Sequence, residues 1–291
     1  MATDVISESN QQAGGFADAV VDWFAGWGAV AVNAFTAVGG LSEFSLRTFK
    51  WMFTRLPRKE TLLPNLFDVG VLSLPVVALT GTFIGMVLAV QSYFTFSRFG
   101  FETQLGAVIN ISLVRELGPV LAATMLAGRV GGRLAAQLGT MRVTEQIDAL
   151  TSMGTNPIHY LVVPRFLACL FAIPALTIMA DFMGVVGGYF YCIFVLGIDK
   201  HHYLYNAQQF VGTWDLFSGV FKSFFFGGII AMISCYRGFT CRPGAEGVGQ
   251  AATAAFVQSF VMILASDLFL NIVLDKVYAN LWPEGSSFFG S

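Results

Sequence analysis

Five long apolar stretches constrain this chain more than any other feature of its sequence. A helix that crosses about 30 Å of hydrocarbon needs about 20 mostly apolar residues. The stretches that meet this requirement are residues 66–96, 105–130, 166–198, 216–236 and 251–274. Only 12% of the 291 residues are charged, about half the share of a soluble domain. We therefore predict an all-α integral membrane protein with five transmembrane helices.

Prolines and closely spaced glycines are expected to shape these helices. Pro75, Pro119 and Pro174 lie in the first three stretches, and each is expected to kink its helix. Small residues four apart allow two helices to approach closely. The pairs of this kind are Gly81/Gly85, Gly128/Gly132 and Gly184/Gly188. We expect them to pack within the chain, with a seam between two copies as the alternative.

The chain upstream of the apolar stretches has a different composition. Residues 44–60 mix aromatic side chains with Arg and Lys, which favours an interfacial helix lying flat at the lipid headgroups. Residues 1–43 are predicted to be interfacial or partly flexible, and a sixth span over residues 25–41 is the alternative. The membrane domain is predicted over residues 61–281, followed by a tail over residues 282–291.

The distribution of Lys and Arg predicts the orientation, because cytoplasmic loops carry an excess of both. A cytoplasmic N-terminus and five crossings place 11 of the 16 basic residues on the cytoplasmic side. These residues are Arg47, Lys50, Arg55, Arg58, Lys59, Arg129, Arg133, Arg142, Arg165, Arg237 and Arg242. The C-terminus is then expected on the outer side.

A polar stretch, LGTMRVTEQIDALTSMGTNP, interrupts the apolar sequence at residues 138–157. It is predicted to form an amphipathic cytoplasmic helix, with Val143, Ile147 and Leu150 on one stripe. Gly139 is expected to precede this helix, and Gly154 to end it. Such a helix fits a groove in a soluble partner or rests on the bilayer. The pattern alone leaves both readings open.

The sequence carries no recognisable motif for an energy source or for catalysis. It contains no G-x-x-x-x-G-K-[ST] phosphate loop, no H-E-x-x-H metal motif and no nucleophile elbow. We therefore predict a non-catalytic subunit with no metal site and no cofactor of its own. A net charge of −2 provides no basic field for nucleic acid, so no nucleic-acid partner is expected.

Residues 115–150, RELGPVLAATMLAGRVGGRLAAQLGTMRVTEQIDAL, resemble the signature of the MlaE/YrbE family. These are permease subunits of ABC transporters that act with MCE-domain proteins in lipid transport. The resemblance extends over residues 44–280. It includes MGTNPIHYLVVPRFLA (153–168), FKSFFFGGII (221–230), GAEGVGQAATAAFVQSFVMILASDLFL (244–270) and GVLSLPVVALTGTFIGMVLAVQ (70–91). Gln137 departs from relatives that often carry an acidic residue there.

The resemblance implies a permease domain with an interfacial helix and five spans, acting as a homodimer or with a close paralogue. It also implies that the helix between spans two and three couples to an ATPase subunit, which holds the ATP and Mg. The coupling residues implied are Gln137, Met141, Arg142, Glu145, Gln146 and Asp148. Further implied partners are an MCE-domain protein, a small regulatory subunit on the ATPase, and phospholipid. The location implied is the bacterial inner membrane, with a role in outer-membrane lipid asymmetry.

Charged residues within the spans are candidates for a lipid site, because ionisable groups at membrane depth normally face a cavity or a partner. Arg115 is able to bind a headgroup phosphate beside Glu116. The alternative is a structural pair with Lys222 or Asp267. Lys222 is expected either to snorkel to the interface or to meet headgroups or an MCE subunit. The role of Asp267 stays open.

Two further groups of span residues have either a functional or a structural role. Phe83 and Met86 are predicted to line an acyl-chain cavity, with lipid-facing bulk as the alternative. Asp181 is expected to lock helix packing, since an unpaired carboxylate in a span must be protonated or find a cation.

Two rival functions remain at this stage. An ion-coupled secondary lipid carrier would need titratable groups along a path and internal repeats, and no repeat is evident in the five unequal spans. A structural membrane anchor for a cytoplasmic complex would carry no cargo. Co-purified ATPase and bound lipid would distinguish the three.

Overall fold

The computed structural model describes residues 23, 28, 32, 35, 36, 38–54, 57, 59–100 and 104–281. The chain divides into two units, residues up to 49 and residues from 50 onward. In the first unit, residues 38–49 are helical. Most of residues 25–41, the alternative sixth span, and the whole of the tail from residue 282 lie outside the described residues. The interfacial placement of residues 44–60 stays a prediction.

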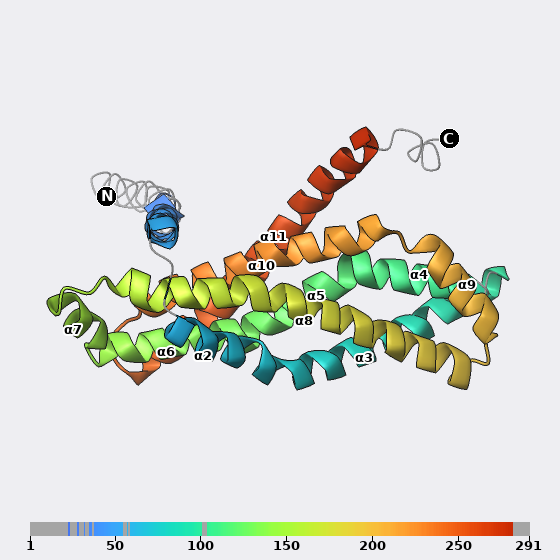
Figure 1. The fold of residues 1–291 in the computed structure, drawn as a ribbon, viewed down its shortest axis with the longest axis horizontal. Helices are drawn as coiled ribbons and strands as arrows, with labels where there is room; N and C mark the ends of the chain where they lie inside the picture. Colours follow the sequence, from blue (N-terminus) through green and yellow to red (C-terminus); the bar gives the residue numbers. More distant parts are fainter. Residues whose placement is uncertain are drawn as a thin grey trace, which may run out of the picture. The chain divides into compact units, whose positions relative to one another are not determined.

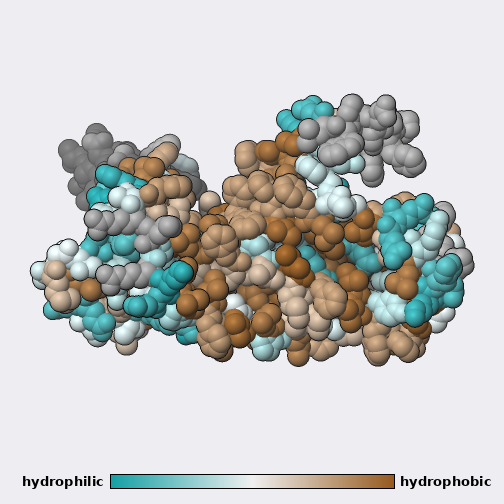
Figure 2. Space-filling view, viewed as in Figure 1, coloured by the Kyte–Doolittle hydropathy of each residue, from teal (hydrophilic) through white to brown (hydrophobic). Residues whose placement is uncertain are grey.

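Within the described part of the second unit, five helical runs are long and apolar enough to cross a membrane. They are Lys59–Phe99, Leu105–Val143, Ile158–Val195, Thr213–Phe239 and Ala245–Asn280. The all-α fold with five spans is therefore confirmed. Figure 2 shows hydrophobic residues over the middle of the bundle and hydrophilic residues towards its ends. Each run exceeds the stretch predicted for it because the helices continue beyond the apolar core into these polar ends.

The helical runs consist of shorter elements. The first contains α2 (Lys59–Val69), a 3-10 turn η1 (Val71–Ser73), α3 (Leu74–Phe96) and η2 (Ser97–Phe99). The second contains α4 (Leu105–Ser112), η4 (Leu113–Leu117), α5 (Gly118–Leu126), η5 (Ala127–Gly131) and α6 (Gly132–Val143), followed by α7 (Gln146–Ser152). The remainder are η6 (Ile158–Val162), α8 (Val163–Phe190), η7 (Tyr191–Val195), α9 (Lys200–Phe210), α10 (Thr213–Phe239) and α11 (Ala245–Leu281).

Two of the three prolines coincide with changes in helix type. Pro75 is the second residue of α3, directly after the 3-10 turn η1. Pro119 is the second residue of α5, directly after the π-helical turn η4. Proline lacks an N–H and crowds the preceding turn, so a local change of helix type relieves both problems. By contrast, α8 continues as an α-helix through Pro174.

The core of the bundle forms where α8 packs against α2, α3 and α10. Glycine makes the α3–α8 contact possible, because a Cβ on Gly85 would lie 1.9 Å from the carbonyl oxygen of Gly184. A Cβ on Gly187 would lie 2.3 Å from the carbonyl oxygen of Thr82. Backbones approach this closely only where side chains are absent. The pairs Gly81/Gly85 and Gly184/Gly188 thus serve packing within the chain.

The helices α7 and α9 lie at opposite ends of the bundle in Figure 1, which we call the α7 end and the α9 end. The predicted helix between spans two and three is present as α7, but residues 138–143 do not belong to it. Instead α6 continues the second span to Val143, and the chain turns at Glu145, which has a left-handed φ of 59°. Gly139 lies inside α6, where a Cβ would meet Cys241 Sγ at 3.3 Å. It is therefore a packing residue and not a helix boundary.

Candidate functional site

Seven polar residues gather towards the α9 end, where η4, α10 and α11 meet. Members of this charged cluster are Arg115, Glu116, Asp215, Lys222, Asp267, Asn271 and Asp275. The cluster contains four residues that the sequence singled out and three that it did not.

Lys222 lies at the centre of the cluster, and its side chain is only 1% exposed. Its Nζ is 3.1 Å from Glu116 Oε1 and 3.4 Å from Asp267 Oδ1. Because α10 begins at Thr213, Lys222 lies nine residues, or about 14 Å, inside the helix. Of the alternatives for Lys222, snorkelling to the interface is therefore excluded. The cost of burying the ammonium is offset by these two carboxylates.

Local backbone features explain how Lys222 reaches this position. Pro119 has no N–H to donate to the carbonyl of Arg115 four residues earlier. The Lys222 ammonium supplies the missing donor, at 3.2 Å from that oxygen. One turn before Lys222, a Cβ on Gly219 would lie 2.4 Å from the carbonyl oxygen of Val114. Only glycine allows α10 to approach η4 so closely, so Gly219 and Pro119 together position Lys222.

Arg115 connects η4 to the C-terminal part of α11. Its guanidinium pairs with Asp275 and lies 3.9 Å from Asp215, yet the side chain remains 37% exposed. Asn271 donates to Glu116 at 2.9 Å and to Asp267 at 3.3 Å. A signal for two of the three missed residues, Asn271 and Asp275, does exist in the sequence. Positions 267, 271 and 275 are four apart and hence lie on one face of a helix.

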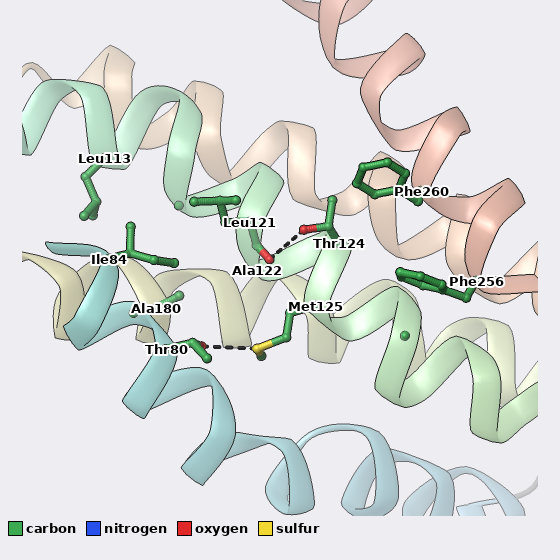
Figure 3. Close-up of a pocket in the computed structure, with 13 residues that line it drawn as sticks. Thr80, Ile84, Leu113, Leu121, Ala122, Thr124, Met125, Ala180, Phe256 and Phe260 are labelled. Atoms are coloured by element: carbon green, nitrogen blue, oxygen red, sulfur yellow. Dashed lines mark hydrogen bonds between the residues drawn. The ribbon is translucent and has the colours of Figure 1, made fainter. Parts of the chain in front are cut away.

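An apolar cavity of about 460 Å³ lies beside the same segments, between α3, α5, α8 and α11. We call it the central cavity. Figure 3 shows Phe256 and Phe260 of α11 across from Thr80 and Ile84 of α3. Leu113 and Gly118, which flank Arg115 and Glu116 on the second run, also line it. The charged cluster and the central cavity therefore share two elements, the second helical run and α11.

The predicted cavity residues of α3 do not line this cavity. Thr80, Gly81 and Ile84 supply that wall, and Thr80 Oγ1 donates to Met125 Sδ at 3.2 Å. Phe83 is instead 55% exposed, and Met86 is partly buried outside the lining. Neither residue lines the central cavity, and their place at an acyl-chain cavity stays a prediction.

Asp181 occupies the wall between α8 and α5. It is buried, and its Oδ1 has no hydrogen-bond partner among the described residues. A Cβ on residue 118 would lie 1.7 Å from this oxygen. Gly118 is therefore required by the position of the Asp181 side chain. This contact fits the predicted packing role, and of the two alternatives for the carboxylate, a cationic partner is not found in the described part of the chain.

The α6–α7 corner carries the predicted coupling residues. Arg142 Nη1 donates to Asp148 Oδ1 at 2.5 Å, which ties α7 to the end of α6. Ile147 is buried beneath the corner, whereas Glu145 and Gln146 are exposed. Gln137 and Met141 lie on α6 and are partly buried. The six residues are therefore divided between α6, the turn at Glu145 and α7, with an exposed polar surface on the turn and α7.

Comparison with known proteins adds an independent finding. A family model described as Permease MlaE matches residues 62–273. The "Probable ABC transporter permease protein RC0129" of Rickettsia conorii is 44% identical over 241 residues, which cover 83% of this chain and 93% of that protein. A similarly named protein of Synechocystis is 44% identical over 217 residues, covering 75% of this chain and 82% of the relative.

A third relative has a more specific name. The "Intermembrane phospholipid transport system permease protein MlaE" of Haemophilus influenzae is 35% identical over 214 residues, covering 73% of this chain and 82% of that protein. The family match covers more than half of the chain and includes the charged cluster up to residue 273. The chain belongs to the MlaE permease family.

Proposed function

We propose that this chain is the membrane permease of an ATP-driven transporter that moves phospholipid. One observation carries the proposal: the charged cluster adjoins the apolar central cavity on the same helices. Seven residues, or about 10 Å of α11, separate Phe260 in the cavity from Asp267 in the cluster. A phospholipid has the same division, with a charged headgroup beside acyl chains. The name of the Haemophilus influenzae relative supports the same cargo.

Arg115 is the residue we assign to the headgroup. Its guanidinium remains partly exposed after pairing with Asp275, and it is able to form paired hydrogen bonds with a phosphate. Glu116 and Asp267 hold Lys222, whose buried ammonium fixes the floor of the cluster. The acyl chains would lie against Leu121, Phe256 and Phe260. Side chains that are already held in place lose little conformational freedom when the headgroup binds.

The α6–α7 corner is the proposed contact with an ATPase subunit, which would hold ATP and Mg. A continuous helical run from Leu105 to Val143 links this corner to Arg115 and Glu116. The Arg142–Asp148 ion pair fastens α7 to that run. A displacement of α7 on ATP binding would therefore be transmitted along one helix to the charged cluster. This geometry supports coupling residues on both α6 and α7.

The proposed assembly is a homodimer in the bacterial inner membrane. Exposed apolar side chains follow the second half of α11, and a second copy would cover part of this surface. They are Leu264, Leu268, Phe269, Ile272 and Val273. The α7 end would face the cytoplasm, following the excess of Lys and Arg, and the C-terminus the periplasm. An MCE-domain protein would bind at the α9 end, serving outer-membrane lipid asymmetry, and a small regulatory subunit would bind the ATPase.

Native purification followed by a transport assay tests this proposal. The complex should retain an ATPase subunit and phospholipid, both identified by mass spectrometry. In proteoliposomes, Arg115→Ala should reduce ATP-dependent phospholipid transfer at least tenfold, whereas Lys276→Ala should not. Lys276 lies on an exposed position of α11 beside Asp275 and serves as the matched control. Transfer driven by a proton gradient without an ATPase would refute the proposal.

A further inference from the structure

A second cavity lies at the α9 end, on the side of the bundle formed by α4, α8 and α9. It has a volume of about 510 Å³ and is mostly apolar, with walls that include Val185, Val186, Leu204 and Val211. We call it the α9 cavity. Neither the charged cluster nor the central cavity shares a lining residue with it. It therefore requires an explanation of its own.

Two buried polar groups face this apolar space. Tyr203 is 1% exposed and Asn110 is 4% exposed, and both line the cavity. Tyr203 Oη and Asn110 Oδ1 have no hydrogen-bond partner within the described residues. The Asn110 side chain lies close enough to act on the Tyr203 hydroxyl, but no hydrogen bond joins Tyr203 Oη to Asn110 Oδ1. An unsatisfied buried polar group costs about 1–3 kcal/mol, so a missing partner for both is the simplest explanation.

Tyr203 is suited to act as a hydrogen-bond donor. Burial raises the pKa of its hydroxyl above the ordinary value, so the group stays protonated. Its ring is held in a packed cluster with Leu105, Ile109 and Cys192. Gly106 allows this position, because a Cβ there would lie 2.7 Å from the carbonyl oxygen of Tyr203. The hydroxyl is therefore fixed in direction before any ligand binds.

The depth of the two polar groups identifies the class of ligand. Asn110 lies five residues, or about 8 Å, inside the first residue of α4. A Cβ on Gly188 would be 3.7 Å from Tyr203 Oη, and Gly188 lies seven residues, or about 10 Å, before the end of η7. The headgroup layer is about 5–8 Å thick in each leaflet. Both groups thus lie about one and a half to two turns inside the ends of their spans, the depth at which we place the ester bonds of glycerolipids.

The shape and surroundings of the cavity exclude water as a sufficient occupant. A single water accounts for about 30 Å³, and apolar cavities remain dry. Val186 and Leu204 are exposed apolar residues at the cavity walls. An occupant that matches this lining combines an apolar chain with a polar atom that reaches Tyr203 and Asn110.

We propose that the α9 cavity binds one fatty-acyl ester chain of a membrane glycerolipid, with the Tyr203 hydroxyl donating to an ester carbonyl oxygen. Asn110 Oδ1 accepts a hydrogen bond from a hydroxyl of the same ligand or of a water beside it. This lipid site is separate from the cargo site and does not depend on the direction of transport or on ATP. Diacyl and monoacyl glycerophospholipids share the necessary ester, and only the monoacyl form adds a free glycerol hydroxyl for Asn110.

Photolabelling of the full chain tests this inference. The protein is delipidated in detergent and mixed with near-stoichiometric phosphatidylethanolamine that carries a diazirine in its acyl chain. A second arm uses the monoacyl form of the same probe. Labelling is mapped by peptide mass spectrometry. We expect saturable labelling of residues 185–211 by one or both probes. Loss of one hydrogen bond in Tyr203→Phe should weaken it about fivefold.

Matched variants separate the site from general lipid contact. Ala207→Leu, which narrows the cavity, should abolish the saturable labelling. Tyr205→Phe on the same helix should not affect it, because Tyr205 is 57% exposed and does not line the cavity. Size-exclusion profiles check that each variant is folded. Labelling that does not saturate, that is unchanged in Tyr203→Phe, or that is replaced by a protein cross-link at Leu204 would overturn the inference. Each of these outcomes is independent of transport activity.

Discussion

Replacement of Lys222 by Met is the sharpest test of the charged cluster. Methionine has a similar length and retains the packing, but it removes the ammonium from Glu116, Asp267 and the Arg115 carbonyl. Removing one partner of a buried ion pair costs about 3–5 kcal/mol, because the other charge remains buried and unpaired. Glu116 is 39% exposed, which permits partial solvation. We therefore expect a loss of about 3 kcal/mol.

The assay is reversible unfolding in mixed micelles, with loss of helicity followed by circular dichroism. Lys276→Met serves as the control, because Lys276 is exposed and such changes usually stay within about 0.5 kcal/mol. Adding Glu116→Gln and Asp267→Asn to Lys222→Met should recover part of the loss, since neutral amides no longer require a cation. Such non-additivity is the signature of side chains in one network.

Two results would refute this reasoning. If Lys222→Met is as stable as the unaltered chain, the ammonium is not compensating buried carboxylates. If the triple variant is no more stable than Lys222→Met alone, the loss arises from packing and not from charge.

Two further predictions concern backbone geometry. Gly85→Leu should prevent accumulation of folded protein, because its Cβ would lie 1.9 Å from the Gly184 carbonyl oxygen. Gly249→Ala should not, because the space around Gly249 is open. Fluorescence-detected size exclusion measures the yield of both variants, and equal yields would contradict the packing argument. Glu145→Gly should stabilise the α6–α7 corner by about 1 kcal/mol and Glu145→Val should destabilise it, because the left-handed φ of 59° suits glycine. Hydrogen exchange at the Ile147 amide measures the difference. Protection that is unchanged in both variants would contradict this prediction.

The five spans were predictable because span length and apolarity are local properties of the sequence. The α3–α8 contact was also within reach, since glycines four apart permit close approach. The same glycines also indicate the direction in which Phe83 faces. Phe83 is two residues from both Gly81 and Gly85, about 200° around the helix, and therefore faces away from α8. Aromatic character alone does not show which side of α3 a residue occupies.

Other features depend on tertiary structure that the pattern does not contain. The burial of Lys222 requires Gly219 and Pro119 to bring α10 against η4, and those residues are far apart in sequence. The corner at Glu145 had no signal, because glutamate rarely adopts a left-handed conformation. For Asp181, the cost of a buried charge left two alternatives, a cationic partner or a neutral carboxyl group, and the choice depends on which side chains the fold brings near it.

The composition of the charged cluster bears on which headgroup it favours. Two cations, Arg115 and Lys222, face four carboxylates, Glu116, Asp215, Asp267 and Asp275, so its formal charge is +2 − 4 = −2. A purely anionic headgroup would be attracted by Arg115 but repelled by the surplus carboxylates. A zwitterionic headgroup places its phosphate at Arg115 and its ammonium at Asp275 or Asp215, so that each of its charges has a partner of opposite sign. Competition between phosphatidylethanolamine and phosphatidylglycerol in the transport assay measures this preference. A preference for phosphatidylglycerol would mean that the carboxylates lie beyond the reach of the headgroup or bind protons.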